Sequence, residues 1–513
     1  MIDKIRKSIA NLVIPRLNGE FVQAEFDRYL SFVRSGFGGF IVFGGEKDTL
    51  KEALKELEQA AGRRLLILSD LEQGLGQQVA GGSLLPPAMA VSHAIDPENY
   101  KDVKIFRKSV EIIAREAQAV GINVILAPVA DIHTNPANPI ICTRAYGSDS
   151  VKVSWFVKEY INVLQGGGAE PTGLLGCVKH FPGHGDTDLD SHLSLPMVSA
   201  DLERLYSVEL APFRSAISAG IKMVMVGHLL VKAVDPLFSV TLSSKAIHGL
   251  LREKLGFDGV VITDAMNMGA VKDTYGEASA CLMALMAGCD ILLHPDDPEV
   301  VVDFIAANWS KAEERVKKAG KRVESFREKL RLVNKQPLSS ASPLTGPLED
   351  GIVNVLSRKS LRVRKGTPCL RGNEALFVID EDDKQSLSSG QGSVFIGRIK
   401  QKYPGVGLQR NPNSFFSKDI SGRQHDRPVI VALFSRIAAW KGKSGLSEDN
   451  MRLLMRILSV FSKTTVISFG SPYLLEGIEA DTLINAWWSG EAAQVEVAEL
   501  LMSQNDIKKG FWQ

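Results

Sequence analysis

Three histidines, three aspartates and one lysine crowd into residues 178–192, directly after the apolar run 174–178. An apolar run that ends in glycines and polar residues is typical of a buried strand opening into a loop. Within this stretch, Asp190 and His192 stand two positions apart, so in an extended segment the carboxylate and the imidazole point the same way and can touch. An aspartate bonded to one ring nitrogen fixes the tautomer and leaves the other nitrogen to move a proton near neutral pH.

Two further residues have the chemistry of a site. Asp264 follows the apolar segment 259–263, and a carboxylate at the tip of such a strand is costly to desolvate unless it is paired or used; alternatively, it caps the next helix. Arg144 can donate two hydrogen bonds to hydroxyls or to a carboxylate if it faces inward. Its alternative role is a salt bridge that stabilises its own loop.

The elements that must position these residues follow a regular alternation as far as residue 335. Short apolar segments, predicted as strands, occur at 11–14, 39–43, 65–68, 124–127, 177–179, 223–226, 260–263 and 291–293. Between them, apolar residues recur at three- and four-residue intervals, as in helices packed on a sheet, at 109–119, 150–164 and 201–218. Eight strands, each followed by a helix, predict a parallel (β/α)8 TIM barrel, with a doubly wound open sheet as the alternative.

A Pro-, Ser- and Gly-rich stretch at 336–347 follows the basic helical segment 309–332 and predicts a domain boundary. We expect a barrel domain at 1–335, a linker at 336–350 and a C-terminal domain at 351–513. In this last domain, strands are predicted at 375–379, 394–397, 429–434 and 465–469, with a helix at 447–461. This pattern indicates a smaller α/β sandwich, and the absence of a P-loop or a complete GxGxxG motif gives nucleotide binding little support.

The predicted strand ends collect the polar residues. In a (β/α)8 barrel, active sites lie on the loops after the carboxyl ends of the strands. Six of the nine histidines of the chain follow such ends, namely His133, His180, His184, His192, His228 and His294. Asp70, Asp131 and Lys179 do so as well. One shared pocket accounts for this placement better than scattered surface positions do.

Composition excludes several function classes. The 513 residues are 45% hydrophobic and 23% charged, with a formal net charge of +1, which gives no general attraction to nucleic acid or to an anionic membrane. Five widely spaced cysteines without a CxxC pair argue against a zinc ribbon or a redox pair, and four of them are set in apolar, core-like surroundings. The N-terminal residues lack the apolar core of a signal peptide, and no stretch is long and apolar enough for a membrane span. We therefore expect a cytoplasmic protein without nucleic-acid or membrane partners.

The motifs together resemble a known family. The sequence KHFPGHGDT at 179–187, followed by DSH at 190–192, is similar to the signature of bacterial β-N-acetylhexosaminidases of glycoside hydrolase family 3, the peptidoglycan-recycling type. Segments 255–266, 127–147 and 69–76 resemble other blocks of that family, and the likeness runs from about Gly38 to Pro295. The loop that begins at Asp70 reads DLEQGLG where this subgroup commonly has DQEGGR, which leaves the substrate details around it open. The C-terminal domain resembles the family's sandwich only through 467–473.

The resemblance implies roles for individual residues. Asp264 corresponds to the nucleophile, His192 to the acid/base and Asp190 to its orienting partner. The residues that would bind the hydroxyls of the terminal sugar are Asp70, Arg144, Lys179, His180 and His228. The implied reaction removes terminal N-acetylglucosamine from peptidoglycan fragments or related glycosides through a covalent glycosyl-enzyme, without a metal or cofactor.

Other functions stay open. A histidine acid/base does not repel an incoming anion, so a β-N-acetylglucosaminide phosphorylase is the nearest alternative. A metal-dependent hydrolase would leave Asp264 without a role, and the ligand spacing is not a strong zinc signature. Its ligands would be His180, His184, His192, Asp186 and Asp190. A non-catalytic sugar-binding module is the remaining alternative, and neither the aglycone nor the oligomeric state follows from the sequence.

Overall fold

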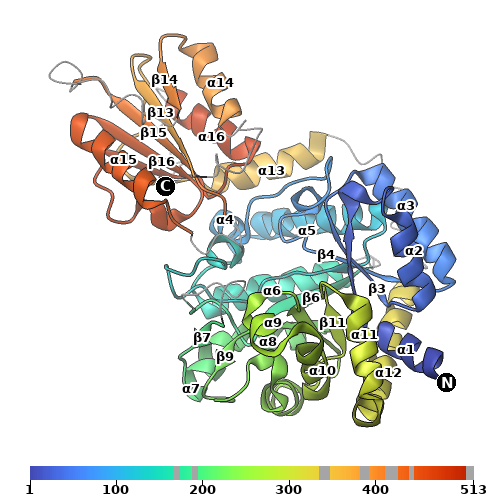
Figure 1. Ribbon diagram of the computed structural model, residues 1–513. Coiled ribbons are helices and arrows are strands. Elements are labelled where there is room, and N and C mark those ends of the chain that lie inside the picture. The colour runs from blue at the N-terminus through green and yellow to red at the C-terminus, as the bar shows by residue number, and fades with distance from the viewer. Residues whose placement is uncertain are drawn as a thin grey trace. The chain divides into compact units, whose positions relative to one another are not determined.

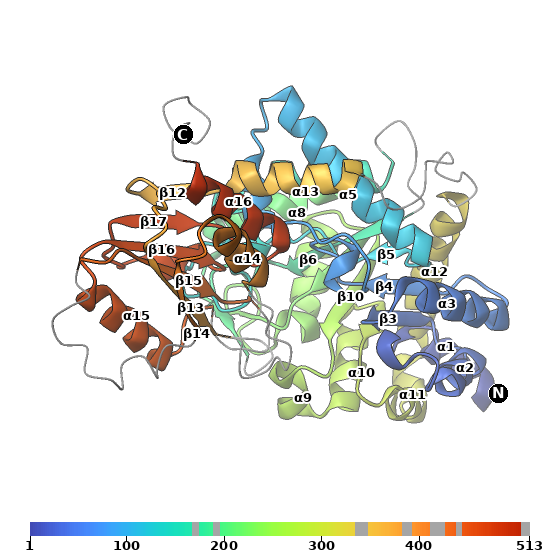
Figure 2. The same ribbon diagram turned by 90° about the horizontal axis from the view of Figure 1, so that it is seen from above.

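The computed structural model describes residues 1–166, 174–187, 195–333, 347–381, 392–410, 426–437 and 444–503 (Figures 1 and 2). The chain forms two compact units. The first comprises residues 1–85, 104–141 and 145–349, and the second comprises residues 86–103, 142–144 and 350–513. Within the described residues, no helix is long and apolar enough to cross a membrane.

The first unit is built on one parallel sheet with the strand order β1-β11-β10-β8-β6-β5-β4-β3-β2. β1 and β2 are separated only by Pro15; β1 pairs with β11 and β2 with β3, so one stretch of chain joins both edges of the sheet. If β1 and β2 are counted as one strand, the nine strands become eight and form a closed ring. This confirms the predicted barrel. The strands are β1 (Val13–Ile14), β2 (Arg16–Asn18), β3 (Gly39–Phe43), β4 (Leu66–Ser69), β5 (Val124–Ile125), β6 (Leu175–Phe181), β8 (Met223–Val226), β10 (Val260–Ala265) and β11 (Ile291–Leu293).

Helices surround this barrel (Figure 2) because each carries an apolar stripe that packs on the strands. In α3 the buried residues are Leu50, Ala53, Leu54 and Leu57, which is the spacing of one helical face. The side chain of Asp149 caps α6 by accepting hydrogen bonds from two backbone N–H groups of its first turn. The helices are α1 (Ile2–Ala10), α2 (Phe26–Ser35), α3 (Lys47–Ala61), α5 (Tyr100–Val120), α6 (Ser150–Leu164), α7 (Leu202–Arg204), η4 (Leu205–Glu209), α8 (Ala211–Ser218), η6 (Lys245–Lys254), α9 (Gly269–Tyr275), α10 (Glu277–Ala287), α11 (Pro298–Ala307) and α12 (Trp309–Val333).

Short strands and single turns of helix lie in the loops of the first unit. β7 (Met197–Val198) pairs in parallel with β9 (Leu230–Val231). Single turns of helix occur at η1 (Gly19–Phe21), η2 (Leu75–Gln77) and η5 (Val240–Leu242). The predicted helix 201–218 is divided between α7, η4 and α8, so its helical character is confirmed although it is not one regular helix.

The second unit contains a mixed sheet with the order β12-β17-β16-β15-β13-β14, in which only the β12–β17 pairing is antiparallel. Its strands are β12 (Arg362–Lys365), β13 (Ala375–Asp380), β14 (Gly407–Arg410), β15 (Val429–Phe434), β16 (Thr464–Phe469) and β17 (Thr482–Asn485). α14 (Ser393–Lys402) and α16 (Glu491–Met502) cover one face, and α15 (Glu448–Val460) covers the other. This is the predicted α/β sandwich. The remaining helices of the unit are α4 (Ala88–Ala94), η3 (Cys142–Arg144), α13 (Pro347–Ser360) and η9 (Pro472–Leu475).

One predicted strand of this unit is wrong. Residues 394–397 belong to helix α14, in which Phe395, Ile396 and Ile399 are the buried residues. This spacing places all three on one side of a helix, whereas a strand would alternate its buried positions. The short apolar run was therefore part of a helical stripe. Of the predicted linker, residues 336–346 lie outside the described residues and 347–350 begin α13.

Candidate active site

The sheet has an interior and an exterior face, and Gly176 of β6 distinguishes them. A Cβ atom on Gly176 would lie 3.0 Å from the side chain of Leu164 in α6, so this position faces the surrounding helices. Successive residues of a strand point to opposite faces. Cys177 therefore faces the interior of the barrel, where it is fully buried.

Strand register extends this interior face to two predicted site residues. Cys177 of β6 and Val260 of β10 both pair with Met223 of β8, so the three share the interior face. Two residues further along β6 stands Lys179, and four residues further along β10 stands Asp264. Both side chains therefore belong to the interior at the carboxyl ends of the strands, where active sites of such barrels lie.

Lys179 is the centre of a buried ion-pair network. Its Nζ lies 2.6 Å from Oδ1 of Asp70 and 2.7 Å from Oε1 of Glu72, while its side chain is only 2% exposed. A buried ammonium group needs such partners, because desolvation otherwise outweighs its favourable interactions. The Asp70 side chain keeps 25% of its surface exposed, so the network still presents polar atoms to a ligand. Glu72 was not predicted as a site residue; its signal was an acid two positions after Asp70 in the loop that follows β4.

The electrostatics of Cys177 link this network to Asp264. Burial raises the pKa of the Cys177 thiol, the charge of Lys179 lowers it, and the charges of Asp70 and Asp264 raise it further. Both carboxylates and the ammonium group therefore act on the same buried sulfur. The structure thus brings together Asp70, Lys179 and Asp264, which are far apart in the sequence.

Asp264 lies where β10 departs from regular pairing with β11, between Ile262 and Ala265. Such bulges redirect side chains and are common beside active sites. Oδ1 of Asp264 accepts a hydrogen bond from the backbone N–H of Ala265 at 2.8 Å, which orients the carboxylate. The residue is partly exposed.

His228 packs behind this segment. Its Nε2 donates to the carbonyl oxygen of Ala265 at 3.0 Å, and its Nδ1 lies 2.8 Å from Oγ1 of Thr241. Both ring nitrogens therefore have protein partners, and a bond to a sugar hydroxyl would have to replace one of them. Substrate binding by His228 stays a prediction, whereas its hydrogen bond directly supports the backbone beside Asp264.

Asp131 binds two residues near the carboxyl end of β6, His180 within the strand and His184 just after it. It is fully buried, and its carboxylate accepts hydrogen bonds from Nδ1 of His180 at 2.7 Å, from the backbone N–H of His180 at 3.3 Å and from that of His184 at 2.7 Å. Burial alone raises the pKa of Asp131, but the charge of His180 and these hydrogen bonds outweigh it and hold the pKa below its usual value. Because Nδ1 of His180 is bound to Asp131, Nε2 is the ring nitrogen left for a sugar hydroxyl.

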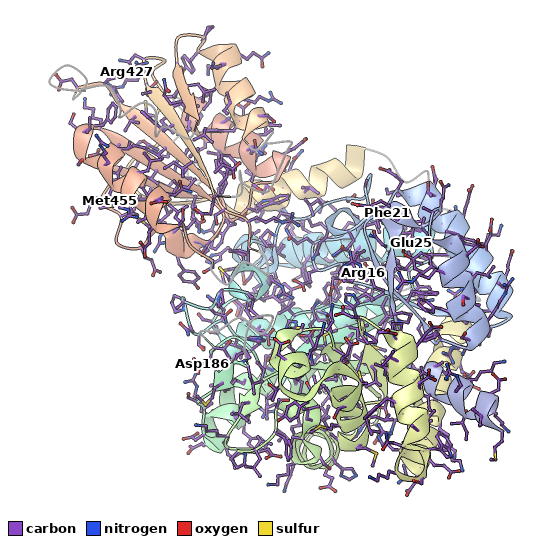
Figure 3. The ribbon with its side chains drawn as sticks, in the orientation of Figure 1. Arg16, Phe21, Glu25, Asp186, Arg427 and Met455 are labelled. Atoms are coloured by element: carbon purple, nitrogen blue, oxygen red, sulfur yellow. The ribbon has the colours of Figure 1, made fainter. Side chains whose placement is uncertain are left out.

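His184 stabilises the loop in which it lies. Burial lowers its pKa to about 4, so the ring is neutral at neutral pH. Its Nδ1 lies 2.8 Å from Oγ1 of Thr187, and its carbonyl oxygen accepts a hydrogen bond from the Asn138 side chain. Asp186, labelled in Figure 3, forms an ion pair with Arg204 at 3.0 Å. These bonds hold residues 184–187 against the loop that follows β5.

Three predicted site residues are not tested by the structure. Asp190 and His192 lie outside the described residues, so their roles as orienting partner and acid/base stay predictions. Arg144 lies in η3, which belongs to the second compact unit, and its role as a sugar ligand stays a prediction.

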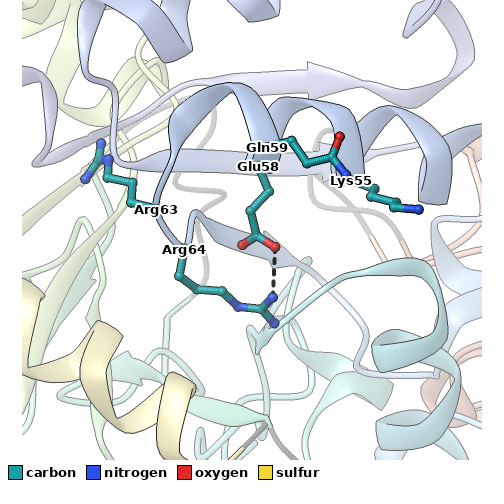
Figure 4. A pocket seen from close by; sticks show the side chains of 5 residues that line it. All are labelled: Lys55, Glu58, Gln59, Arg63 and Arg64. Atoms are coloured by element: carbon teal, nitrogen blue, oxygen red, sulfur yellow. Dashed lines mark hydrogen bonds and ion pairs between the residues drawn. The ribbon is translucent and has the colours of Figure 1, made fainter. Parts of the chain in front are cut away.

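A pocket of about 440 Å³ opens at a different place (Figure 4). It is lined by the last turns of α3 and by the residues that precede β4, and Glu58 forms an ion pair with Arg64 there at 2.9 Å. This is the amino end of β4. Active sites of (β/α)8 barrels lie at the opposite, carboxyl ends of the strands, so the pocket is not the candidate site.

Comparison with known proteins identifies the family. Residues 5–326 match the Glycosyl hydrolase family 3 N terminal domain. The chain belongs to glycosyl hydrolase family 3. The resemblance predicted from its motifs is therefore confirmed.

Named proteins and a solved structure match this chain over different lengths. A β-hexosaminidase of Thioalkalivibrio sulfidiphilus is 31% identical over 296 residues, which cover 56% of this chain and 82% of that protein. A β-N-acetylglucosaminidase/β-glucosidase of Cellulomonas fimi is 30% identical over 277 residues, 52% of this chain, and the match spans about half (47%) of that relative's length. The solved structure of a family 3 β-N-acetylglucosaminidase from Paenibacillus sp. str. FPU-7 has a TM-score of 0.83 and 28% identity, covering 99% of this chain and 98% of that one.

Proposed function

We propose that the protein is a retaining exo-β-N-acetylglucosaminidase that removes terminal N-acetylglucosamine from peptidoglycan fragments or related glycosides. The observation that carries the proposal is the convergence of Asp70, Lys179 and Asp264 at the carboxyl end of a family 3 barrel. The names of its relatives from Thioalkalivibrio sulfidiphilus and Paenibacillus support the substrate class.

Asp264 is the nucleophile of the proposed reaction. Its carboxylate attacks the anomeric carbon as the bond to the leaving oxygen breaks, which gives a covalent glycosyl-enzyme. The hydrogen bond from Ala265 to Oδ1 holds the carboxylate in one orientation for this attack. A fixed nucleophile lowers the entropic cost of reaching the transition state.

His192 is the proposed acid/base, and Asp190 is its orienting partner. In the first step the imidazolium donates a proton to the leaving oxygen, and in the second step the neutral imidazole takes a proton from the water that attacks the glycosyl-enzyme. An unperturbed histidine titrates close to neutral pH, so both protonation states are accessible.

The terminal sugar is held by groups with complementary hydrogen-bonding capacity. Lys179 donates to hydroxyl oxygens, Asp70 accepts from hydroxyl hydrogens, and Nε2 of His180 is left for a hydroxyl because Nδ1 is bound to Asp131. Arg144 and His228 complete the proposed set of sugar ligands. No metal or cofactor takes part in these steps.

Covalent trapping tests the assignment directly. We expect incubation with an activated 2-deoxy-2-fluoro or N-acetyl glycoside, followed by peptide mass mapping, to place the label on Asp264. Asp264→Asn should remain unlabelled under the same conditions. A label on any other residue would overturn the assignment, and a sugar 1-phosphate formed when phosphate is added would identify a phosphorylase instead.

Three broader features belong to the same proposal. The domain division is a barrel at 1–335, a linker at 336–350 and a C-terminal domain at 351–513. The proposed location is cytoplasmic, in keeping with five cysteines that are all free, four of them buried. The partner is a small carbohydrate substrate, with a muropeptide as one form of it.

A further inference from the structure

Arg16 of β2 is an exposed cation on the interior face of the barrel. A chain of strand pairings connects it to the interior position Leu175 of β6, two residues before Cys177. The paired residues in this chain are Arg16, Ile41, Leu68, Val124 and Leu175. Because paired residues of parallel strands lie on the same face, Arg16 is on the interior face, and it is exposed.

Arg16 lies on an aromatic platform. The guanidinium carbon is 4.9 Å from the centre of the Phe43 ring, at the carboxyl end of β3. The ring of His294, which follows β11, lies 5.7 Å from the Phe43 ring. These three residues come from neighbouring strands and form one cluster, which we call the Arg16 cluster.

The charge of Asp70 acts on the Arg16 cluster through His294. Burial lowers the pKa of His294 to about 4, the charge of Arg16 lowers it further, and the charges of Asp296 and Asp70 act in the opposite direction. His294 is therefore neutral at neutral pH and feels both Arg16 and Asp70. The positive charge of the cluster comes from Arg16 alone.

The guanidinium of Arg16 is positioned without being neutralised. Among the described residues, no carboxylate forms an ion pair with it, and the guanidinium lies over the ring of Phe43. Elsewhere in this unit, Arg64, Arg204 and Arg252 are each paired with a carboxylate. Stacking on a ring occupies the flat face of a guanidinium and leaves the N–H groups at its edge available for a planar or tetrahedral oxyanion.

The position of β2 in the ring indicates which part of a substrate would reach Arg16. With β1 and β2 counted as one strand, β2 is four strands away from β6 in either direction around the barrel. β2 is also two strands from β4, and Asp70, which follows β4, is a proposed ligand of the terminal sugar. We therefore expect the terminal sugar to be the part of the substrate that reaches Arg16.

We propose that Arg16, stacked on Phe43, binds an anionic ester or carboxylate group carried by the terminal sugar of the substrate. The protein would then favour β-N-acetylglucosaminides whose terminal sugar is phosphorylated, sulfated or carboxylated over the unsubstituted sugar. This inference rests on the proposed function, since it uses Asp70 to place the sugar.

The test compares aryl β-N-acetylglucosaminides that differ only in a 6-phosphate or 6-sulfate group. We expect the full-length protein to have at least a tenfold higher kcat/KM for an anionic substrate than for the unsubstituted one. Arg16→Gln should reduce this ratio to about one, and Arg16→Lys should retain part of it because the charge stays while the two-pronged donor is lost. Arg34→Gln, at an exposed position near the end of α2, is the matched control and should leave the ratio unchanged.

Several outcomes would overturn the inference. Equal kcat/KM values for the anionic and neutral substrates in the native protein would do so, as would a ratio that Arg16→Gln does not alter. A preference for an anionic group on the aglycone would place the oxyanion on the leaving group and not on the terminal sugar. If Arg16→Gln lowered both kcat/KM values equally, Arg16 would bind a hydroxyl rather than an anion.

Calorimetric binding separates this inference from the proposed activity. N-acetylglucosamine 6-phosphate should bind at least tenfold more tightly than N-acetylglucosamine, and Arg16→Gln should remove the difference. Binding does not require turnover, so a protein that lacks glycosidase activity but shows this preference would contradict the proposed function and support the role of Arg16. Equal binding of the two sugars, or binding of neither, would reject it.

Discussion

At the scale of single residues, the candidate site depends on buried groups whose charge states are set by their surroundings. Sequence motifs located Asp70, Lys179, His180 and Asp264 because each stands at the end of an apolar run or directly after it. They did not show that Glu72 shares Lys179 with Asp70, since that contact depends on how β4 and β6 face each other across the barrel. A one-dimensional pattern contains no such information.

Asp131 is the residue whose loss should most directly disturb the sugar-binding side of the site. Asp131→Asn keeps the size but removes the charge, so Nδ1 of His180 loses its anionic acceptor and the ring loses its fixed orientation. We expect kcat/KM for an aryl N-acetylglucosaminide to fall tenfold or more, mainly through a higher KM. Steady-state kinetics measures this, and unchanged KM with a properly folded variant would contradict the role of Asp131.

Buried neutral histidines make stability sensitive to acid. Burial lowers the pKa of His184 from 6.5 to about 4, so below pH 6.5 the unfolded chain takes up a proton that the folded chain does not. The free energy of unfolding should therefore decrease as the pH falls from about 6.5 towards 4, by roughly 2–3 kcal/mol for this histidine between pH 7.5 and 4.5. His133, whose pKa burial also lowers to about 4, adds in the same direction.

Chemical denaturation of His184→Gln at pH 7.5 and 4.5 measures this contribution. The difference in unfolding free energy between the two pH values should be smaller in the variant than in the native protein. His248→Gln is the matched control, because the side chain of His248 is 67% exposed and its removal should leave that difference unchanged. An equal pH dependence in native protein and His184→Gln would show that folding does not lower the pKa of His184.

At the scale of elements, periodicity predicted the strands of the barrel because strands buried on both faces are continuous apolar runs between charged helices. It failed at 394–397, where a helical stripe in α14 also happened to be a continuous apolar run. Length distinguishes the two in principle, but the residues that extend α14 beyond this run are mainly polar. In the same way, the division of the predicted helix 201–218 into α7, η4 and α8 has no signal in periodicity alone.

Close approach of two loops makes Gly185 a sensitive position. A Cβ atom there would lie 1.8 Å from the carbonyl oxygen of Ile132, and neither backbone can move without disturbing the bonds of Asp131 and His184. We expect Gly185→Ala to lower the free energy of unfolding by about 1–3 kcal/mol, the usual cost of overpacking, and to reduce kcat/KM. Thermal unfolding and kinetics measure both effects.

Gly249→Ala provides the comparison for this substitution. Gly249 lies within η6, and a Cβ atom there would have no neighbour within 4 Å. An alanine at a helical position is expected to be neutral or slightly stabilising, by up to about 1 kcal/mol. If Gly185→Ala behaved like Gly249→Ala, the contact between the two loops would not be tight in solution.

At the scale of the whole barrel, the carboxyl and amino ends of the strands have different roles. The carboxyl ends hold the candidate site, whereas Asp290, just before β11, holds together elements at the amino ends. Its fully buried carboxylate lies 2.7 Å from Arg252, 2.7 Å from Arg315 and 3.3 Å from Arg322, and it also accepts the backbone N–H of Val261. It thereby joins β10 and β11 to η6 and α12.

Removal of this carboxylate should separate stability from activity. Asp290→Ala leaves the guanidinium groups of Arg252 and Arg315, which are 9% and 12% exposed, without their charge partner. Leaving buried charges uncompensated costs roughly 3–5 kcal/mol, so the melting temperature should drop by several degrees. Since Asp290 lies at the opposite end of the barrel from Asp264, kcat/KM measured well below the new melting temperature should stay within about twofold of the native value. A large loss of activity in a variant that is still folded at the assay temperature would mean that the amino ends of the strands help to position the nucleophile.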